Sequence, residues 1–339
     1  LSIEKEGEIM LEKKDGKFKK MVNLLRNYVN VNNIKLFAWK CLRTFFIISI
    51  SYVILFPLFV KISTSIMHRQ DIFDQTVRWI PRHITLDNFK LVFVTMDYPR
   101  AFMNSFLLST GVSIVQLISC TLVGYGFARF KFRFKNVFFG LVIFVLIVPP
   151  QLLLIPLYLN FRFFDMFGLI PNGGFNLLDS FWPFFLMALT ATGIRNSLFI
   201  YIIRQFFMGM PKVLQEAAYV DGAGPFKTFF KVMLPGAAPA LVVIFIFSFV
   251  WMWNDYFYIN IFVPDRILLP NMLAELVDEV AEHLVIIDDQ FSDVRGITEE
   301  YGPMINNTGS LLFLAPLLIF YGVMQRYFVE SVERTGIVG

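Results

Sequence analysis

The sequence Pro211-Lys-Val-Leu-Gln-Glu-Ala-Ala-Tyr-Val-Asp-Gly-Ala-Gly-Pro-Phe226 separates two long apolar segments of this chain. Its opening proline suits the first position of a helix, where the missing N–H costs nothing. Leu214, Ala217 and Ala218 recur at helical spacing and predict a short helix with a small apolar face. Asp221-Gly222 predicts the end of that helix.

A second short helix is expected directly after this turn. Pro225 can open it, and Leu234-Pro235 is expected to close it. The two helices would form a compact helix–turn–helix between membrane spans, with alanines that let another surface approach closely. Such a loop is suited to docking into a cleft on another protein.

These residues also carry a family resemblance. Glu216-Ala217-Ala218, Gly222, Val232 and Leu234-Pro235 resemble, in identity and spacing, the cytoplasmic loop signature of binding-protein-dependent ABC importer permeases. An ordinary interhelical loop is the alternative, but it does not account for so many matches at fixed spacing. Further matches point to the carbohydrate-uptake branch and its MalG-like half: Asp221-Gly222-Ala223, Phe230, Pro239, the Thr-Leu-x-Asn-aromatic pattern at 85–89, and Gln325-Arg326-Tyr327-Phe328-Val329.

Composition independently predicts a polytopic membrane protein. The chain has 339 residues, of which 56% are hydrophobic and 41 are Phe, and its mean hydropathy is +0.62. Several apolar runs approach the roughly 20 residues that cross a bilayer as a helix, and their length favours helices over a barrel. The two cysteines and three histidines show no disulfide or metal-ligand spacing, so we expect no metal site.

Six membrane spans are expected. The third should bend at Pro149-Pro150, and the fourth is interrupted by polar residues at 190–196, which mark either a simple break or part of a solute pathway. The expected spans are 44–62, 101–128, 137–159, 181–207, 237–263 and 309–328.

The charge distribution supports this topology. Basic residues cluster before the first span, at 129–135, at 204–231 and in the tail, whereas the 264–308 loop is strongly acidic. Six crossings place all the basic clusters on one side, which the positive-inside rule makes cytoplasmic, together with both ends of the chain. Within the acidic loop, the spacing of Leu273, Leu276, Val277 and Val280 predicts an amphipathic helix.

The resemblance implies an all-α type I ABC importer permease fold with six transmembrane helices in a prokaryotic plasma membrane. It divides the chain into a basic cytoplasmic segment (1–41), a permease domain (42–329) that contains the coupling loop (211–235) and the acidic extracytoplasmic loop (264–308), and a cytoplasmic tail (330–339).

The chain is not expected to be an enzyme. Gly222-Ala-Gly-Pro-Phe226-Lys227-Thr228 fails as a phosphate loop because Phe226 stands where glycine must precede the lysine. No nucleophile–base arrangement is visible, so no catalytic residue and no cofactor are assigned to this chain. The resemblance places ATP and Mg²⁺ in a separate ATPase subunit.

By resemblance, the 211–235 loop is a lever that an ATPase subunit moves. The residues expected to act in coupling are Glu216, Ala217, Ala218, Asp221, Gly222, Ala223, Leu234 and Pro235. A tail contact to the ATPase is expected for Gln325, Arg326 and Gly339, although Glu330-Ser331-Val332-Glu333 and Gly336-Ile337-Val338-Gly339 depart from the usual family ending.

The solute path is expected near the outer end of the fifth span. Trp251, Asn254 and Asp255 are its candidates, because aromatic rings stack on sugars and an acid this near the membrane should face water or protein. Tyr256 and Tyr258 are interpreted instead as an interfacial aromatic belt.

The expected function is therefore that of a permease subunit in an ATP-driven sugar or oligosaccharide importer. Its implied partners are a second permease subunit, two ATPase subunits, an extracytoplasmic solute-binding protein and the lipid membrane; no nucleic-acid motif is present. The alternatives are an ABC permease for another solute, such as glycerol phosphate or a polyamine, or an ion-coupled secondary transporter, which would need internal repeats and more embedded carboxylates.

Overall fold

The computed structural model describes residues 31–336, except 73, 75, 78, 167, 169–173, 194 and 288–300. The chain divides into two units, residues 1–61 and 62–339. The described part of the first unit belongs to α2 (Val31–Ser65), in which residues 35–65 are long and apolar enough to cross a membrane. This confirms a first membrane helix, longer than expected. The basic residues before position 31 lie outside the described residues.

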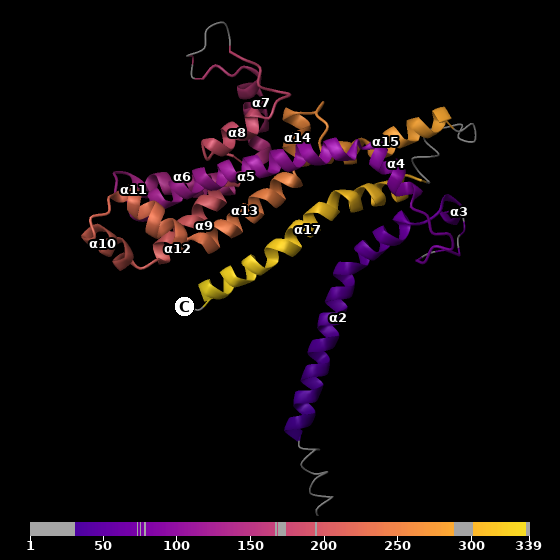
Figure 1. The fold of residues 1–339 in the computed structure, drawn as a ribbon, viewed down its shortest axis with the longest axis horizontal. Coiled ribbons are helices and arrows are strands. Elements are labelled where there is room, and N and C mark those ends of the chain that lie inside the picture. The colour runs from indigo at the N-terminus through magenta and orange to yellow at the C-terminus, as the bar shows by residue number, and fades with distance from the viewer. Residues whose placement is uncertain are drawn as a thin grey trace, which may run out of the picture. The chain divides into compact units, whose positions relative to one another are not determined.

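The second unit is organised around α5 (Tyr98–Arg129), which packs against α9 (Asn196–Gly209) and α13 (Ala238–Trp253) (Figure 1). The buried side of α5 is rich in small residues, so the helix axes can approach closely. At Gly124 the approach is closest, because a Cβ atom there would lie 2.0 Å from Cγ2 of Ile203.

The third span bends as expected. The chain runs through α6 (Lys135–Ile147), the short helix η1 (Pro150–Leu153) and α7 (Leu154–Arg162), with an angle of 102° at the break. Two consecutive prolines remove backbone donors there and hold the preceding residue in an extended conformation.

The fourth span is interrupted where its sequence predicts. Helix α8 (Trp182–Leu189) ends before a turn in which Ala191 and Arg195 have left-handed backbones, with φ of 55° and 65°, and α9 comes next. Neither piece is long enough to cross a membrane alone. Among the described residues, three helices are long and apolar enough to do so, or five if each sharply bent pair counts as one.

The fifth span is shorter than expected. Helix α13 ends at Trp253, and a separate helix, α14 (Tyr256–Phe262), begins after a two-residue break. The expectation of one helix through residue 263 is therefore wrong. Asn254 and Asp255 make side-chain hydrogen bonds to backbone groups at this break, and these bonds favour helix ends over helix interiors.

At the opposite end of the unit, α4 (Asp87–Thr95) and α15 (Leu269–Ile287) pack on α17 (Gly302–Gly336) (Figure 1). The predicted amphipathic helix is confirmed, because Leu276 and Val280 are fully buried against these neighbours. Much of the expected 264–308 loop is thus helical. The last helix begins at residue 302 instead of 309, because its first turn joins the same core, and it continues to residue 336.

A polar cluster around the buried carboxylate of Asp71 ties α3 (Arg69–Ile72) to the residues before α4. One carboxylate oxygen of Asp71 accepts hydrogen bonds from the backbone N–H groups of Arg82 and His83, both at 2.8 Å, and the other lies 2.8 Å from Nδ1 of His83. These hydrogen bonds lower the pKa of Asp71, His83 contributing most. No sequence pattern had indicated this cluster.

Candidate functional site

Residues 211–236, named here the coupling segment, form a chain of very short helices. They are α10 (Lys212–Val220), α11 (Pro225–Thr228), the π-helix η2 (Phe229–Met233) and α12 (Leu234–Gly236). The predicted helix–turn–helix is confirmed. The second helical run, Pro225–Gly236, ends one residue after the expected Leu234-Pro235, and the helical path then bends by 74° into α13.

Gly222 gives the segment its sharp turn. Its φ is +75°, and the bonds around it are those of a Schellman cap: the Gly222 N–H donates to Tyr219 O at 3.1 Å, and the Ala223 N–H donates to Ala218 O at 2.9 Å. Only glycine adopts this backbone without strain. The predicted role of Gly222 in the turn is thus confirmed in geometry.

The first half of the coupling segment is exposed despite its apolar residues. Val220 and Phe226 are 88% and 82% exposed, and the expected coupling residues Glu216, Ala217 and Asp221 are not buried either. Such a surface, with apolar side chains left in contact with solvent, is typical of a site for another protein.

The second half of the segment is anchored in the core. Phe229 and Met233 of η2 are buried, and the ring of Phe229 lies 4.6 Å from that of Tyr125 on α5. The coupling segment is therefore in direct contact with α5 and continues through α12 into α13.

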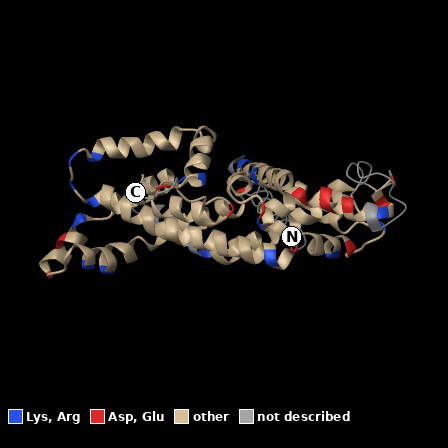
Figure 2. Cartoon of the chain, turned by 90° about the horizontal axis from the view of Figure 1, so that it is seen from above, with Lys and Arg blue, Asp and Glu red and all other residues tan. Residues whose placement is uncertain are grey.

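Charge is distributed unequally between the two ends of this unit. Figure 2 shows Lys and Arg gathered at the end that carries the coupling segment, whereas Asp and Glu line the helix at the other end. The basic end includes Arg129, which donates to the carbonyl of Met210 at 2.7 Å and so joins the end of α5 to the start of the segment.

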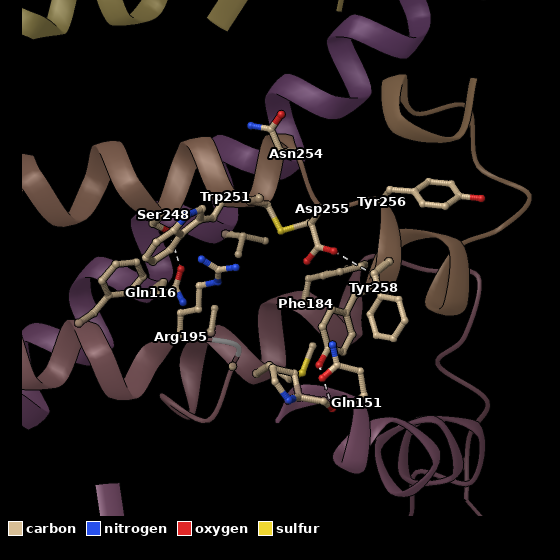
Figure 3. Close-up of a pocket in the computed structure, with 18 residues that line it drawn as sticks. Gln116, Gln151, Phe184, Arg195, Ser248, Trp251, Asn254, Asp255, Tyr256 and Tyr258 are labelled. Carbon is tan, nitrogen blue, oxygen red and sulfur yellow. Dashed lines mark hydrogen bonds between the residues drawn. The ribbon is translucent and has the colours of Figure 1, made fainter. Parts of the chain in front are cut away.

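Beyond the coupling segment, α13 forms one wall of a cavity of about 530 Å³, whose other walls come from α5, α8, α9, α14 and η1 (Figure 3). A buried network orders one side of it. Gln116 donates to Asn196 and accepts from Ser248, and the Asn196 amide donates to Met187 O at 3.4 Å. Both ends of the Gln116 amide are therefore occupied by the protein.

Trp251 lines the cavity, but three groups already lie against its ring. The Arg195 guanidinium carbon is 4.1 Å from the ring centroid, and Phe199 and Phe247 stack on the ring at 5.4 and 5.5 Å. Arg195 comes from the polar break before α9, so the structure brings together two features that are far apart in sequence. No pattern in the sequence pairs them.

Asn254 and Asp255 lie at the end of α13, where both contact the cavity and both serve the backbone. The Asn254 amide donates to Val250 O at 2.7 Å, and Figure 3 shows this side chain pointing away from the cavity centre. Oδ1 of Asp255 accepts from the Tyr258 N–H at 3.0 Å and caps α14. Their part in a solute path stays a prediction.

The interfacial-belt interpretation is wrong for Tyr258. This residue is only 4% exposed, packs among the rings of α7, α8 and α14, and donates to Pro150 O at 3.4 Å. Tyr256 is well exposed. The two tyrosines lie on different sides of α14, one buried and one exposed. The sequence does not show this, because it does not reveal that a new helix begins after the break at 254–255.

The model of one protein family matches residues 120–276, the region that holds both the coupling segment and much of the cavity. That family is the inner-membrane component of binding-protein-dependent transport systems. This region of the chain is similar to that family. The chain is the permease subunit of an ABC importer, a multi-pass plasma-membrane protein that takes part in transport.

Similar proteins include several permeases of named uptake systems. The chain is 27% identical over 298 residues to the arabinooligosaccharide transport permease AraQ of Halalkalibacterium halodurans, covering 86% of this chain and 93% of AraQ. It is 29% identical to the osmoprotective-compound permease GgtD of Synechocystis over 90% and 95% of the two chains. It is 26% identical to the sn-glycerol-3-phosphate permease UgpE of Escherichia coli, covering 82% of this chain and 90% of UgpE.

A solved structure has the same fold. A chain from a bacterial ABC transporter involved in import of the acidic polysaccharide alginate aligns with a TM-score of 0.67 and 20% identity, covering 86% of this chain and 96% of that one. The predicted all-α ABC permease fold is thereby confirmed.

Proposed function

We propose that this permease serves an importer of carbohydrates, in which it pairs with a second permease subunit, two ATPase subunits and an extracytoplasmic solute-binding protein. Relatives that transport arabinooligosaccharides and, in Rhizobium meliloti, alpha-glucosides support the solute class. ATP and Mg²⁺ would be bound by the ATPase subunits.

The observation that carries the proposal is the exposed apolar half of the coupling segment at the basic end of the unit. The basic end faces the cytosol by the positive-inside rule, and there α10 would dock into an ATPase groove. Since η2 and α12 connect α10 to α5 and α13, closure of the ATPases around ATP would move the cavity walls. The cavity would then open to one side of the membrane at a time.

The tail is proposed to make a second contact with the ATPases. Gln325 and Arg326 lie on the last helix, α17, which continues to Gly336, so this contact would come from a helix rather than a loose tail. Gly339, the third residue expected in this contact, lies outside the described residues. The division of the chain at 41, 42, 329 and 330 also stays a prediction.

Site-directed crosslinking tests the docking proposal. A cysteine introduced at Val220, on a background in which exposed Cys41 is replaced by Ser and only buried Cys120 remains, should crosslink to the ATPase subunit in the intact transporter. A matched cysteine at Asp278, on α15 at the acidic end, should not. Crosslinking of position 278 instead of 220 to the ATPase would contradict the orientation and the coupling role together.

A second solute class is supported by the likeness to the glycerol-phosphate permease UgpE. Uptake of labelled solutes into proteoliposomes that contain the complete importer decides between the classes. Transport of neutral or acidic oligosaccharides supports the proposal. If the importer transports only glycerol 3-phosphate, the proposed solute class changes from carbohydrates to phosphorylated polyols.

A further inference from the structure

The cavity contains two opposite charges from separate elements. Arg195 comes from the break between α8 and α9, and Asp255 from the break between α13 and α14. Figure 3 shows both charged groups directed into the same open space from opposite sides. They are the only Asp, Glu, Lys or Arg side chains among the described residues that line it.

The Arg195 guanidinium has unused hydrogen-bonding capacity. It lies over the Trp251 ring at 4.1 Å, but no hydrogen bond or ion pair joins it to any residue that the structure describes. A guanidinium carries donors in a fixed planar fork, and the ring fixes its orientation without using them. The donors are therefore available to oxygen atoms of a molecule in the cavity.

Asp255 offers the complementary acceptors. Its Oδ1 accepts the backbone bond from Tyr258, which fixes the carboxylate in place, and a carboxylate oxygen has further lone pairs. Gln116 cannot serve in the same way, because its amide is held by Asn196 and Ser248. Selection by charge in this cavity therefore depends on Arg195 and Asp255.

We propose that Arg195 and Asp255 form a charge-balanced selector, which favours uncharged, hydroxyl-rich solutes over anionic ones within the carbohydrate class. This inference rests on the proposed function and narrows it. A hydroxyl group both donates and accepts, so it can satisfy the arginine and the aspartate in turn. An anionic sugar would pair with Arg195 but would bring a second negative charge near Asp255, where repulsion between like charges opposes binding.

Binding to the purified transporter without its binding protein tests the selector. Saturation-transfer NMR with maltotriose and with trigalacturonate gives the ratio of their dissociation constants, and the binding protein cannot influence it. The dissociation constant of trigalacturonate for wild-type transporter should be about tenfold or more above that of maltotriose. A factor of this size is expected from repulsion between the ligand's carboxylate and the partly buried Asp255.

Two variants separate the roles of the charges. Asp255→Asn keeps an oxygen that can cap α14 but leaves Arg195 as the single charge, so the preference for maltotriose should vanish or reverse. Arg195→Gln should weaken maltotriose binding while trigalacturonate stays excluded. Arg195→Lys, which keeps the positive charge, should recover part of the maltotriose affinity. Arg204→Gln is the matched control, because Arg204 also lies over a ring, Phe139 at 3.8 Å, but not in the cavity.

Each variant must still co-purify with its ATPase, which shows that it has folded. A wild-type transporter that binds both trisaccharides equally, or neither, would overturn the selector. So would an unchanged ratio in folded Asp255→Asn, or a change in Arg204→Gln as large as that in Arg195→Gln. Uptake of labelled carbohydrates by the complete importer is scored separately: if it persists, the proposed function survives the loss of the selector, and if it is absent, the proposed function itself fails.

Discussion

Two helices outside the membrane spans, α10 and α15, have similar sequences in one respect: each carries an apolar face and a charged one. Leu276 and Val280 of α15 are fully buried by α4 and α17 of the same chain. Leu214 and Val220 of α10 are 44% and 88% exposed. The same amphipathic pattern is thus satisfied internally at one end and left open at the other.

The difference has a physical basis in the path of the chain after each helix. After α15 the chain returns as α17, whose Gly309 lets Leu276 and Leu273 approach the helix backbone. After α10 the Gly222 turn directs the chain back into the core through η2, and no described element covers the outer face of α10. An uncovered apolar face on a rigid anchor suits a partner protein, whereas a covered one stabilises the fold.

The largest expected effect is on transport. Gly222→Asp forces a side chain into a left-handed backbone, at a cost of about 1–2 kcal/mol, and adds a charge to the docking face. We expect ATP-driven uptake to be abolished while membrane insertion is unchanged. Gly224→Asp is the control, because it places the same carboxylate two residues away at an ordinary φ of −70°. Normal uptake by Gly222→Asp would count heavily against the proposed lever role of residues 211–235.

The next effect is on stability and compares the two helices directly. Leu276→Ala should lower the free energy of unfolding by about 2–5 kcal/mol, because the side chain is fully buried. Leu214→Ala should change it by less than about 0.5 kcal/mol, yet reduce uptake. Thermal unfolding of the purified transporter, with uptake measured in parallel, checks both. Equal destabilisation by the two substitutions would mean that α10 is covered within this chain.

A smaller effect on stability is expected where α15 packs against α17. In Gly309→Ala the added Cβ would lie 2.3 Å from Cδ2 of Leu276, and overpacking costs about 1–3 kcal/mol. The higher helix propensity of alanine offsets about 1 kcal/mol of this. Gly322→Ala, on the same helix with open space around it, should leave the melting temperature unchanged or raise it. If Gly309→Ala stabilises the protein, α15 and α17 are not closely packed at this position.

The smallest effect concerns pH at the end that carries α15. Hydrogen bonds from His83 and Arg82 lower the pKa of Asp71, so its contribution to stability is present above the pKa of an unfolded aspartate and is lost as the pH falls through the lower, folded value. Hydrogen exchange at residues 79–85 should therefore speed up in strong acid. In Asp71→Asn exchange should be fast already at neutral pH, whereas Asp87→Asn, at an exposed site, should behave as wild type.

Much of this architecture could be predicted because its signals are local. Apolar length located most of the expected helices, Pro149-Pro150 marked a bend, and the polar residues at 190–196 marked a break. The end of α13 could not be predicted, because Asn254 and Asp255 break a run that is otherwise apolar on both sides. Hydropathy averages over such a run and does not register two capping side chains.

The candidate site also has features that the sequence predicts and features that only the tertiary structure reveals. Gly222 and the alanines of α10 could be located from spacing alone, since a turn and a helix face depend on neighbours in sequence. Trp251, Asn254 and Asp255 were placed near a path, but the partnership of Trp251 with Arg195 joins residues from different helices. Only packing could reveal that the Trp251 ring is already occupied and that Tyr258 is buried.

The sequence by itself determined that this chain crosses a membrane as helices and carries a short helix–turn–helix loop between two of them, because hydropathy, charge bias and short-range spacing are properties of neighbouring residues. The tertiary structure decided which amphipathic helix is covered, which tyrosine is buried and which two opposite charges share a cavity. Those outcomes depend on contacts between segments far apart in the chain, and these contacts are set by how closely α5, α9, α13 and α17 approach one another.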